Sequence, residues 1–309
     1  MHYSPLRYPG GKNKLANFIA NLCIENNIRG HYIEPYSGGA SVALYLLLER
    51  YVDFITINDK DRSLYAFWYS VLNHTEELCK RIEETPITME VWYEQKNIQA
   101  NKETVDLFDL GFSTFFLNRT NRSGIISAGV IGGIEQKGNY LMDCRFNKSD
   151  LIARIKLIGN KRQNIRLLQE DAISLIDIVE EETKTRRNKN TLFYFDPPYF
   201  DKGSTLYMNH YFEDDHKIVS NKIKNIKNIH WVVSYDNVPM IQELYKECRK
   251  KEFSFTHTAY ESRIGEEIML FSNSLILPGI EEWNPLNFKR EKNNKVIKYK
   301  TPKEKLIAM

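Results

Sequence analysis

Two stretches of the chain alternate short apolar runs with longer amphipathic runs, the pattern expected of alternating strands and helices. In the first stretch, the apolar runs 31–33 and 53–57 predict strands. A glycine-rich turn follows the first of them, and the segments 42–48 and 66–72 predict helices. Strands that are separated by helices pair in parallel, so the pattern predicts a sheet with helices on both faces.

The second stretch repeats this pattern closer to the C-terminus. Its apolar runs predict strands at 165–168, 191–195, 229–234 and 267–272, and polar helical segments lie between them. Both stretches therefore predict one α/β fold whose sheet is mostly parallel.

The middle of the chain has a different character. Segments 75–84, 88–101 and 104–117 predict helices, and residues 123–138 form a loop that is rich in glycine, isoleucine and serine. A loop of this length in a compact domain is either functional or disordered. We therefore expect an α/β core that is interrupted by a mostly helical insertion.

The domain boundaries follow from these patterns and from the charge. We assign residues 1–72 and 165–285 to a discontinuous core, 73–164 to the insertion and 286–309 to a basic C-terminal tail that binds DNA or is disordered. Between residues 118 and 166, ten basic residues oppose three acidic ones, a net charge of +7, whereas the whole chain carries +3. A charged stretch of this kind is either a solvated surface or a binding site for nucleic acid.

The composition excludes several classes of protein. The four cysteines lie far apart, which argues against a zinc site and against a disulfide framework. No apolar run approaches the roughly 20 residues that cross a bilayer, and the first residues lack the layout of a secretion signal. We expect a soluble, cytoplasmic protein without a membrane partner or a metal cofactor.

A glycine-rich turn, residues 34–41, is the first candidate site. Glycines here let the backbone approach a ligand at the carboxyl edge of the sheet, where such folds bind nucleotides. Asp59 ends the next strand, where a carboxylate can accept hydrogen bonds from ribose hydroxyls. The pair also occurs in NAD enzymes and in ordinary turns. Glu34 favours S-adenosylmethionine, because an acid repels a pyrophosphate and pairs with an amino group.

The second candidate site, Asp196-Pro197-Pro198-Tyr199, directly follows an apolar strand. Hydrogen bonds from an exocyclic amine to the Asp196 carboxylate and the Pro197 carbonyl would pull the nitrogen toward tetrahedral geometry and aim its lone pair at a methyl donor. The prolines have a fixed φ and no N–H, so they offer no competing donor. Tyr199 presents a face on which a base can stack. An ordinary Pro-Pro turn after a strand is the alternative.

The third candidate site, residues 6–12, contains an aromatic residue, paired glycines and Lys12. It is either a mobile leader with a turn or a segment that folds over a cofactor. In the second case Lys12 would lie near the carboxylate of the cofactor.

Taken in this order along the chain, the three segments resemble those of the Dam-like DNA adenine methyltransferases, the D12 class. That family has an aromatic–Gly-Gly-Lys segment first, then a Phe/Tyr-x-Gly turn, a target-recognition insertion and an Asp-Pro-Pro-Tyr segment. The resemblance extends from Leu6 to about Asn273 and includes further stretches at 115–119, 145–148, 232–235 and 267–273. It implies a Rossmann-like methyltransferase core that uses S-adenosylmethionine.

The resemblance also implies roles for individual residues, which complete the sets predicted from the motifs. The cofactor-binding set is Tyr8, Gly11, Lys12, Glu34, Tyr36, Gly38, Gly39, Asp59, Asp171 and Asp196, with Asp171 beside the adenine ring of the cofactor. The DNA-binding set is Arg7, Asn118, Arg119, Asn121 and Arg122. Arg119 and Arg122 either read guanine edges in the major groove or hold phosphate.

Two departures from the family pattern limit what is carried over. Ala40 stands where many relatives have a third glycine, and we expect cofactor binding to survive this small change. The loop 119–127 lacks the Tyr-Asn-Gly segment of the relatives that methylate GATC, so that target is not carried over.

We therefore expect a site-specific enzyme that transfers a methyl group from S-adenosylmethionine to N6 of an adenine flipped out of duplex DNA. We expect a monomer that is encoded by a prokaryote or a phage, with a restriction endonuclease as a candidate partner. Three alternatives stay open: a structured-RNA adenine methyltransferase, an inactive nucleic-acid-binding relative, and a cytosine-N4 methyltransferase, a class that usually has serine in place of Asp196.

Overall fold

The computed structural model describes residues 2–7, 12–184, 190–200, 211–257, 263–278, 283–291 and 294–300. Its centre is a seven-stranded sheet with the strand order β3-β2-β1-β4-β5-β7-β6. The strands are β1 (His31–Glu34), β2 (Phe54–Asn58), β3 (Ile165–Leu168), β4 (Thr191–Phe195), β5 (His230–Asp236), β6 (Arg249–His257) and β7 (Arg263–Phe271). Strands β1 to β5 run parallel to one another, which confirms the predicted α/β sheet.

One edge of the sheet is antiparallel. Strand β7 runs antiparallel to both β5 and β6, so a β6–β7 hairpin completes the sheet. The sequence analysis missed β6, because its first half, residues 249–252, consists of charged side chains. An edge strand tolerates such charges, since one of its faces and its outer side meet solvent.

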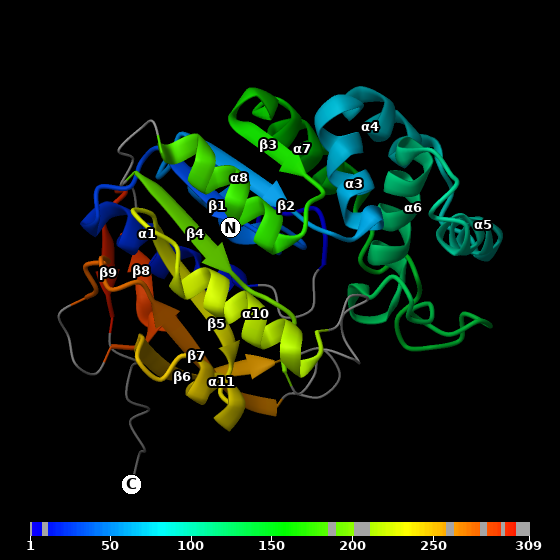
Figure 1. Cartoon of the computed structure of the whole chain (residues 1–309). Coiled ribbons are helices and arrows are strands. Elements are labelled where there is room, and N and C mark those ends of the chain that lie inside the picture. The colour runs from blue at the N-terminus through cyan, green and yellow to red at the C-terminus, as the bar shows by residue number, and fades with distance from the viewer. Residues whose placement is uncertain are drawn as a thin grey trace, which may run out of the picture.

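Helices cover both faces of the sheet (Figure 1). One face packs against α1 (Ala16–Glu25) and α2 (Ser41–Leu48), and the other face packs against α8 (Ala172–Lys184), α10 (Glu213–Lys224) and α11 (Pro239–Leu244). Successive side chains of a strand point to opposite faces, so Tyr32 joins the first layer and Ile33 the second. Because both faces are covered, apolar residues occupy most positions of the parallel strands.

The insertion follows α3 (Arg62–Asn73) and is helical, as predicted. Its helices are α4 (Thr75–Glu84), α5 (Met89–Ala100), α6 (Leu107–Thr120) and α7 (Lys148–Gly159), the last of which was not predicted. Helix α6 approaches α3 closely because Gly111 has no side chain: a Cβ there would lie 2.4 Å from the Ala66 carbonyl oxygen. Residues of the insertion and of the sheet share one hydrophobic core, so the insertion packs as part of the same body.

The segment predicted as a basic C-terminal tail is structured over its described residues. Strands β8 (Phe288–Arg290) and β9 (Ile297–Tyr299) form a hairpin after the 3-10 turn η4 (Pro285–Asn287). The hairpin packs on α1, where the Phe18 ring lies 5.1 Å from that of Phe288 and 5.0 Å from that of Trp283. The described residues of this segment pack on the core, because the apolar side chains of Trp283, Phe288 and Ile297 extend it, and binding of DNA by the segment stays a prediction.

No helix among the described residues has the length and apolar character that a membrane span requires.

Candidate functional site

Acidic residues gather at the carboxyl edge of the parallel sheet. Glu34 ends β1, Asp59 follows β2, Asp171 follows β3 and Asp196 follows β4. Because parallel strands end at the same edge, as their arrowheads show in Figure 1, residues far apart in sequence come together there. This edge is the location expected for the cofactor and for the reaction.

Asp196 is held in one orientation by two partners. Its Oδ1 accepts a hydrogen bond from Ser234 Oγ at 2.8 Å and lies 3.1 Å from Lys12 Nζ. Ser234 is itself fixed by the Tyr194 hydroxyl at 2.9 Å. The Asp196 side chain is 19% exposed, and its Oδ2 accepts no hydrogen bond from the described part of the chain. One carboxylate oxygen is thus held by the protein, and the other can accept a hydrogen bond from a substrate.

Lys12 belongs to the 3-10 turn η1 (Lys12–Leu15) and lies beside Asp196, and its contact with a cofactor carboxylate stays a prediction. Its side chain is only 3% exposed. The ammonium donates to the Tyr199 hydroxyl at 2.7 Å and lies 4.0 Å from Glu267 Oε1. The Lys12 ammonium therefore lies close to two carboxylates, those of Asp196 and Glu267, and to the phenol of Tyr199.

The Tyr199 side chain has hydrogen-bond partners that the sequence analysis did not assign to it. Its hydroxyl donates to Glu267 Oε1 at 2.6 Å and accepts from Lys12, and the residue is 4% exposed. Pro197 and Pro198 are buried as well. In this arrangement Tyr199 links β7 to Lys12, in addition to the base-stacking role that we expected of its ring.

The glycine-rich turn adopts a left-handed conformation at two positions, Gly38 (φ 45°) and Ala40 (φ 47°). A left-handed residue other than glycine costs about 1–2 kcal/mol, which explains why a third glycine suits the position of Ala40. The Gly38 amide donates to Asp59 Oδ2 at 3.0 Å, and its carbonyl accepts from Trp68 Nε1 at 2.9 Å. Asp59 also accepts from the Asp61 amide at 3.0 Å, so the turn and the end of β2 hold each other.

Glu34 is buried at the end of β1, where this turn begins. Its Oε1 accepts hydrogen bonds from the Tyr32 hydroxyl and from the Ala43 amide in α2, both at 3.0 Å. Burial raises the pKa of the Glu34 carboxyl to about 8, against the lowering effect of these two bonds. Burial likewise raises the pKa of Asp59 to about 7, and the nearby Asp61 adds to the effect.

The remaining predicted cofactor residues lie at the rim of the site. Asp171 caps α8 by accepting from the Ile173 amide at 3.0 Å, and its Oδ2 lies 3.3 Å from Lys60 Nζ. The Tyr36 hydroxyl is 2.7 Å from that of Tyr211. Gly39 lies in the turn described above, and the predicted contacts Tyr8 and Gly11 lie outside the described residues.

Two of the predicted DNA-binding residues, Asn118 and Asn121, are buried and hold the loop after α6 in place. Asn118 accepts from the Arg7 amide at 2.7 Å and donates to the carbonyls of Arg7 and Gly124 at 2.7 and 2.8 Å. Asn121 accepts from Trp92 Nε1 at 2.7 Å. Their side chains already have protein partners, so in this structure they support the loop.

The predicted arginines differ in exposure. Arg122 is exposed, whereas Arg119 donates to the carbonyls of Arg145 and Pro5 at 2.8 and 3.3 Å. Burial, together with the charges of Arg7 and Arg154, lowers the pKa of Arg119 to about 10. A group of like charges with few nearby acids favours an anion as its ligand.

Sequence reasoning assigned no role to Ser234 and Glu267, although both lie in stretches that resemble the family. Ser234 is on β5 and Glu267 on β7, which are neighbours in the sheet. The sequence does contain a signal for such residues, namely a polar residue inside an otherwise apolar strand, because a buried polar group needs a hydrogen-bond partner.

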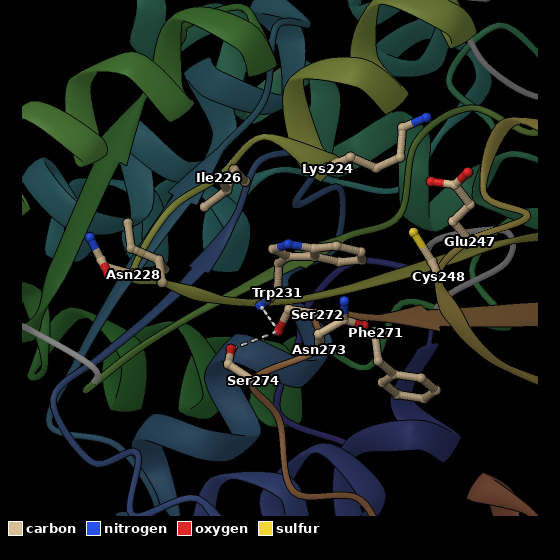
Figure 2. A pocket seen from close by; sticks show the side chains of 11 residues that line it. Lys224, Ile226, Asn228, Trp231, Glu247, Cys248, Phe271, Ser272, Asn273 and Ser274 are labelled. Carbon is tan, nitrogen blue, oxygen red and sulfur yellow. Dashed lines mark hydrogen bonds between the residues drawn. The ribbon is translucent and has the colours of Figure 1, made fainter.

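A hollow lies at the amino end of β5, at the edge of the sheet opposite the acidic residues (Figure 2). It has a volume of about 420 Å³ and is lined by residues near the starts of β5 and β6 and the end of β7, including Trp231, Cys248 and Ser272. Figure 2 shows the Trp231 amide donating to Ser272 Oγ, at 3.2 Å. None of the predicted site residues lines this hollow, so it is separate from the acidic edge.

Comparison with known proteins shows similarity to methyltransferases. Over 232 residues the chain is 27% identical to the Type II methyltransferase M.MjaIII of Methanocaldococcus jannaschii, covering 69% of this chain and 76% of that protein. The solved structure of the rRNA methyltransferase AviRa from Streptomyces viridochromogenes matches 82% of this chain and 83% of that one, with 9% identity and a TM-score of 0.35.

The sequence also matches the family described as D12 class N6 adenine-specific DNA methyltransferase over residues 8–261. That range contains the glycine-rich turn, the whole insertion, Asp196 and its neighbours. Because the match spans most of the chain, and the resemblance seen in the sequence is thereby confirmed, the protein belongs to the D12 class N6 adenine-specific DNA methyltransferase family.

Proposed function

We propose that this protein transfers a methyl group from S-adenosylmethionine to N6 of an adenine flipped out of duplex DNA, within a specific sequence. Family membership supports methylation of DNA adenine. The observation that carries the proposal is the geometry of Asp196, whose Oδ1 is held by Ser234 and Lys12 while its Oδ2 is left for a substrate.

The acidic edge fits the proposed cofactor. S-adenosylmethionine carries a sulfonium and an amino group, and when bound it supplies an electrophilic methyl group. The pKa values of Glu34 and Asp59 are raised because burial disfavours their negative charges, which a cationic ligand would stabilise. Ser37 Oγ is buried in the turn and has no hydrogen-bond partner among the described residues, as expected of a group that forms a hydrogen bond with a bound ligand.

Each residue at this edge suits a different chemical group of the cofactor. Asp59 would accept hydrogen bonds from the ribose, and Asp171 lies on the neighbouring strand end, where the adenine ring of the cofactor is expected. Glu34 and Lys12 have the charges that match the amino and carboxylate groups of a methionine moiety.

At the reacting base, Asp196 acts as a hydrogen-bond acceptor. The lone pair of the adenine amine is delocalised into the ring, which makes the nitrogen a weak nucleophile. Hydrogen bonds from its two N–H groups to Asp196 and to the Pro197 carbonyl favour a tetrahedral nitrogen with an aligned lone pair. The amine proton becomes acidic only after methyl transfer, so a strong base is not required.

The N-terminal segment supports DNA as the substrate, because it ties the loop to the site. Arg7 is bonded to Asn118 at the root of the loop, and Lys12, five residues later, lies beside Asp196. Five residues of extended chain span at most about 18 Å. A duplex that contacts Arg7 and the loop would therefore bring its bases within reach of Asp196 once one of them is flipped, at a cost of a few kcal/mol.

The insertion offers contacts for such a duplex. Arg7 and Arg119 are suited to phosphate, because they lie among other arginines. Farther along the loop, Ile134 and Tyr140 are each 69% exposed, and these apolar side chains suit contact with bases. Asn118 and Asn121 then position the loop rather than reading the DNA.

We also propose that the protein acts as a monomer in the cytoplasm and that its cellular partner is a restriction endonuclease. The name of the relative M.MjaIII, a Type II methyltransferase, supports such a pairing.

The function is tested by expressing the chain in a host that lacks adenine methylation and sequencing its DNA by a method that detects modified bases. We expect N6-methyladenine at one position of one short sequence. Purified protein should then methylate the corresponding duplex and leave structured RNA unmodified. N4-methylcytosine, methylated RNA only, or unmodified nucleic acid despite bound S-adenosylmethionine would contradict the proposal.

Arg122→Ala is expected to relax the sequence preference at one base pair of the target. Arg122 is exposed at the start of the loop, and a bidentate contact to guanine contributes about 1–3 kcal/mol of discrimination. The measurement is methylation of a duplex library in which each target position is varied. Lys137→Ala, an exposed cation paired with Glu135, is the matched control. Uniformly weaker methylation of all sequences, with a smaller salt dependence, would assign Arg122 to phosphate.

Cofactor affinity is expected to rise with pH between about 6 and 8.5, as Asp59 and Glu34 lose protons and come to match a cationic ligand. The stability of the free protein should change in the opposite direction. Both carboxyls hold their protons more tightly in the fold than in the unfolded chain. The stabilisation of the fold that these two protonated carboxyls contribute is complete at pH values below the ordinary carboxyl pKa. It is lost as the pH rises through about 7 to 8, the pKa values of Asp59 and Glu34 in the fold.

Calorimetric titration and thermal melting at several pH values measure both effects. Asp53→Asn, which changes an exposed acid before β2, should leave both pH dependences as they are. Cofactor affinity that stays constant over this pH range would show that Glu34 and Asp59 do not contact the cofactor.

A further inference from the structure

Glu267 is a buried carboxylate at the site to which the proposed reaction assigns no step. Its side chain is 0% exposed on β7, beside the acidic edge of the sheet. Burial raises the pKa of Glu267, whereas the ammonium of Lys12 and the hydrogen bond from Tyr199 lower it. Burying an ionisable group is costly, so a partner of the right charge is expected nearby.

The contacts of Glu267 form a continuous path to Asp196. Glu267 Oε1 accepts from the Tyr199 hydroxyl at 2.6 Å, and that hydroxyl accepts from Lys12 Nζ at 2.7 Å. Lys12 Nζ is 3.1 Å from Asp196 Oδ1 and 4.0 Å from Glu267 Oε1. The ammonium thus lies between the two carboxylates, and the phenol is held at both of its hydrogen-bonding positions.

The sheet supplies both supports from one face. In the antiparallel register of β5 and β7, Asp236 is opposite Glu267, and Ser234 is two residues from Asp236. Cross-strand partners and alternate residues share a face, so Ser234 and Glu267 project to the same side. Ser234 holds Asp196 directly, and Glu267 holds the Lys12–Tyr199 pair that lies against it. Strands give such groups a more rigid base than a loop does.

We propose that Glu267 is a positioning residue of the methyltransferase site: it fixes the Tyr199 hydroxyl and the Lys12 ammonium and, through Lys12, the orientation of Asp196. This inference rests on the proposed function, because Asp196 is the group that would meet the adenine amine. It assigns to β7 a role in the reaction, although no residue of β7 needs to touch the base or the cofactor.

The test is a set of kinetic measurements on Glu267→Ala, Glu267→Gln, Tyr199→Phe and the double variant Glu267→Ala/Tyr199→Phe. We expect Glu267→Ala to lower kcat at least about tenfold, with the KM for DNA changed less than about twofold. Glu267→Gln should retain more activity, because an amide oxygen still accepts from Tyr199. The double variant should be no worse than the worse single variant, since both changes break the same path.

Glu266→Gln is the matched control, because Glu266 is the preceding residue on β7, is exposed and points to the opposite face. It should leave kcat unchanged. Additive losses in the double variant, or a well-folded Glu267→Ala protein with normal kcat, would overturn the proposal. Loss of activity that merely follows a fall in Tm, with no rescue by glutamine, would overturn it as well.

A readout that does not depend on activity separates this inference from the proposed function. Lys12 is 3% exposed, and we expect its modification by an amine reagent, followed by mass spectrometry, to become at least about fivefold faster in Glu267→Ala. If the normal protein failed to methylate adenine while Lys12 became reactive in this way, the proposed function would fail and the positioning of Lys12 would stand. An unchanged rate would overturn the link between Glu267 and Lys12.

Discussion

Replacing Asp196 by alanine is expected to lower kcat for methyl transfer by about 10³-fold or more, while affinity for duplex DNA changes by less than about threefold. The carboxylate is the proposed acceptor for the target amine and is positioned by Ser234 and Lys12. Removing it leaves the amine lone pair delocalised and the nitrogen unaligned. The basic loop and Arg7, which would carry duplex binding, are untouched.

The measurement is single-turnover methylation together with fluorescence anisotropy on the same duplex. Asp196→Asn is informative beside it, because the amide keeps the shape but can present only one acceptor oxygen, which Ser234 and Lys12 already engage. Asp143→Ala, an exposed acid in the insertion, is the control. Turnover of Asp196→Ala within about tenfold of normal would remove Asp196 from the mechanism. Since the change leaves Lys12 without one of its partners, Tm is recorded for each variant.

Tyr199→Phe and Tyr199→Ala are expected to differ in the size of their effects. Phenylalanine keeps the ring but loses the hydroxyl that joins Lys12 to Glu267, and we expect kcat to fall about tenfold. Alanine loses the hydroxyl and the ring together, and a fall of about 10²-fold or more should follow, since base–aromatic stacking contributes about 1–3 kcal/mol.

Equal losses in the two variants would assign the whole contribution of Tyr199 to its hydroxyl and none to its ring. Normal activity of Tyr199→Phe would show instead that the bonds to Lys12 and Glu267 are dispensable. Both variants are measured with a matched duplex and with one in which the target adenine is mismatched. A contribution from stacking should still be seen with the mismatched base, because that base is already unpaired.

Much of the fold could be predicted because its signals are local. The runs 165–168 and 191–195 coincide with β3 and β4, and 75–84 coincides with α4, because apolar periodicity and capping act within a few residues. The edge hairpin was harder: the charges at 249–252 hide β6, which becomes a strand only by pairing with β7. The C-terminal hairpin was missed for a related reason, since its apolar residues are few and gain their core from α1.

The candidate site, like the fold, could be predicted from the sequence only where its residues are close together along the chain. Asp196-Pro197-Pro198-Tyr199 is one contiguous segment after a strand, so its chemistry could be seen in the sequence. The partners of Asp196 could not, because Ser234 is 38 residues away and Lys12 meets Tyr199 over a separation of 187 residues. The side chains of Asn118 and Asn121 can form hydrogen bonds with DNA as well as with protein. Only the structure shows that both are buried and that their hydrogen bonds are made with groups of the protein.

The class of the protein can be predicted from its sequence: a mostly parallel α/β core, a helical basic insertion, and motifs whose order along the chain matches the D12 class adenine methyltransferases. Those properties depend on residue type and local spacing. The tertiary structure decided how Asp196 is held, that Tyr199 and Lys12 are tied to Glu267, and that Asn118 joins Arg7 to the loop. These are contacts between distant segments, which exist only after strands and helices have packed and buried groups have found partners.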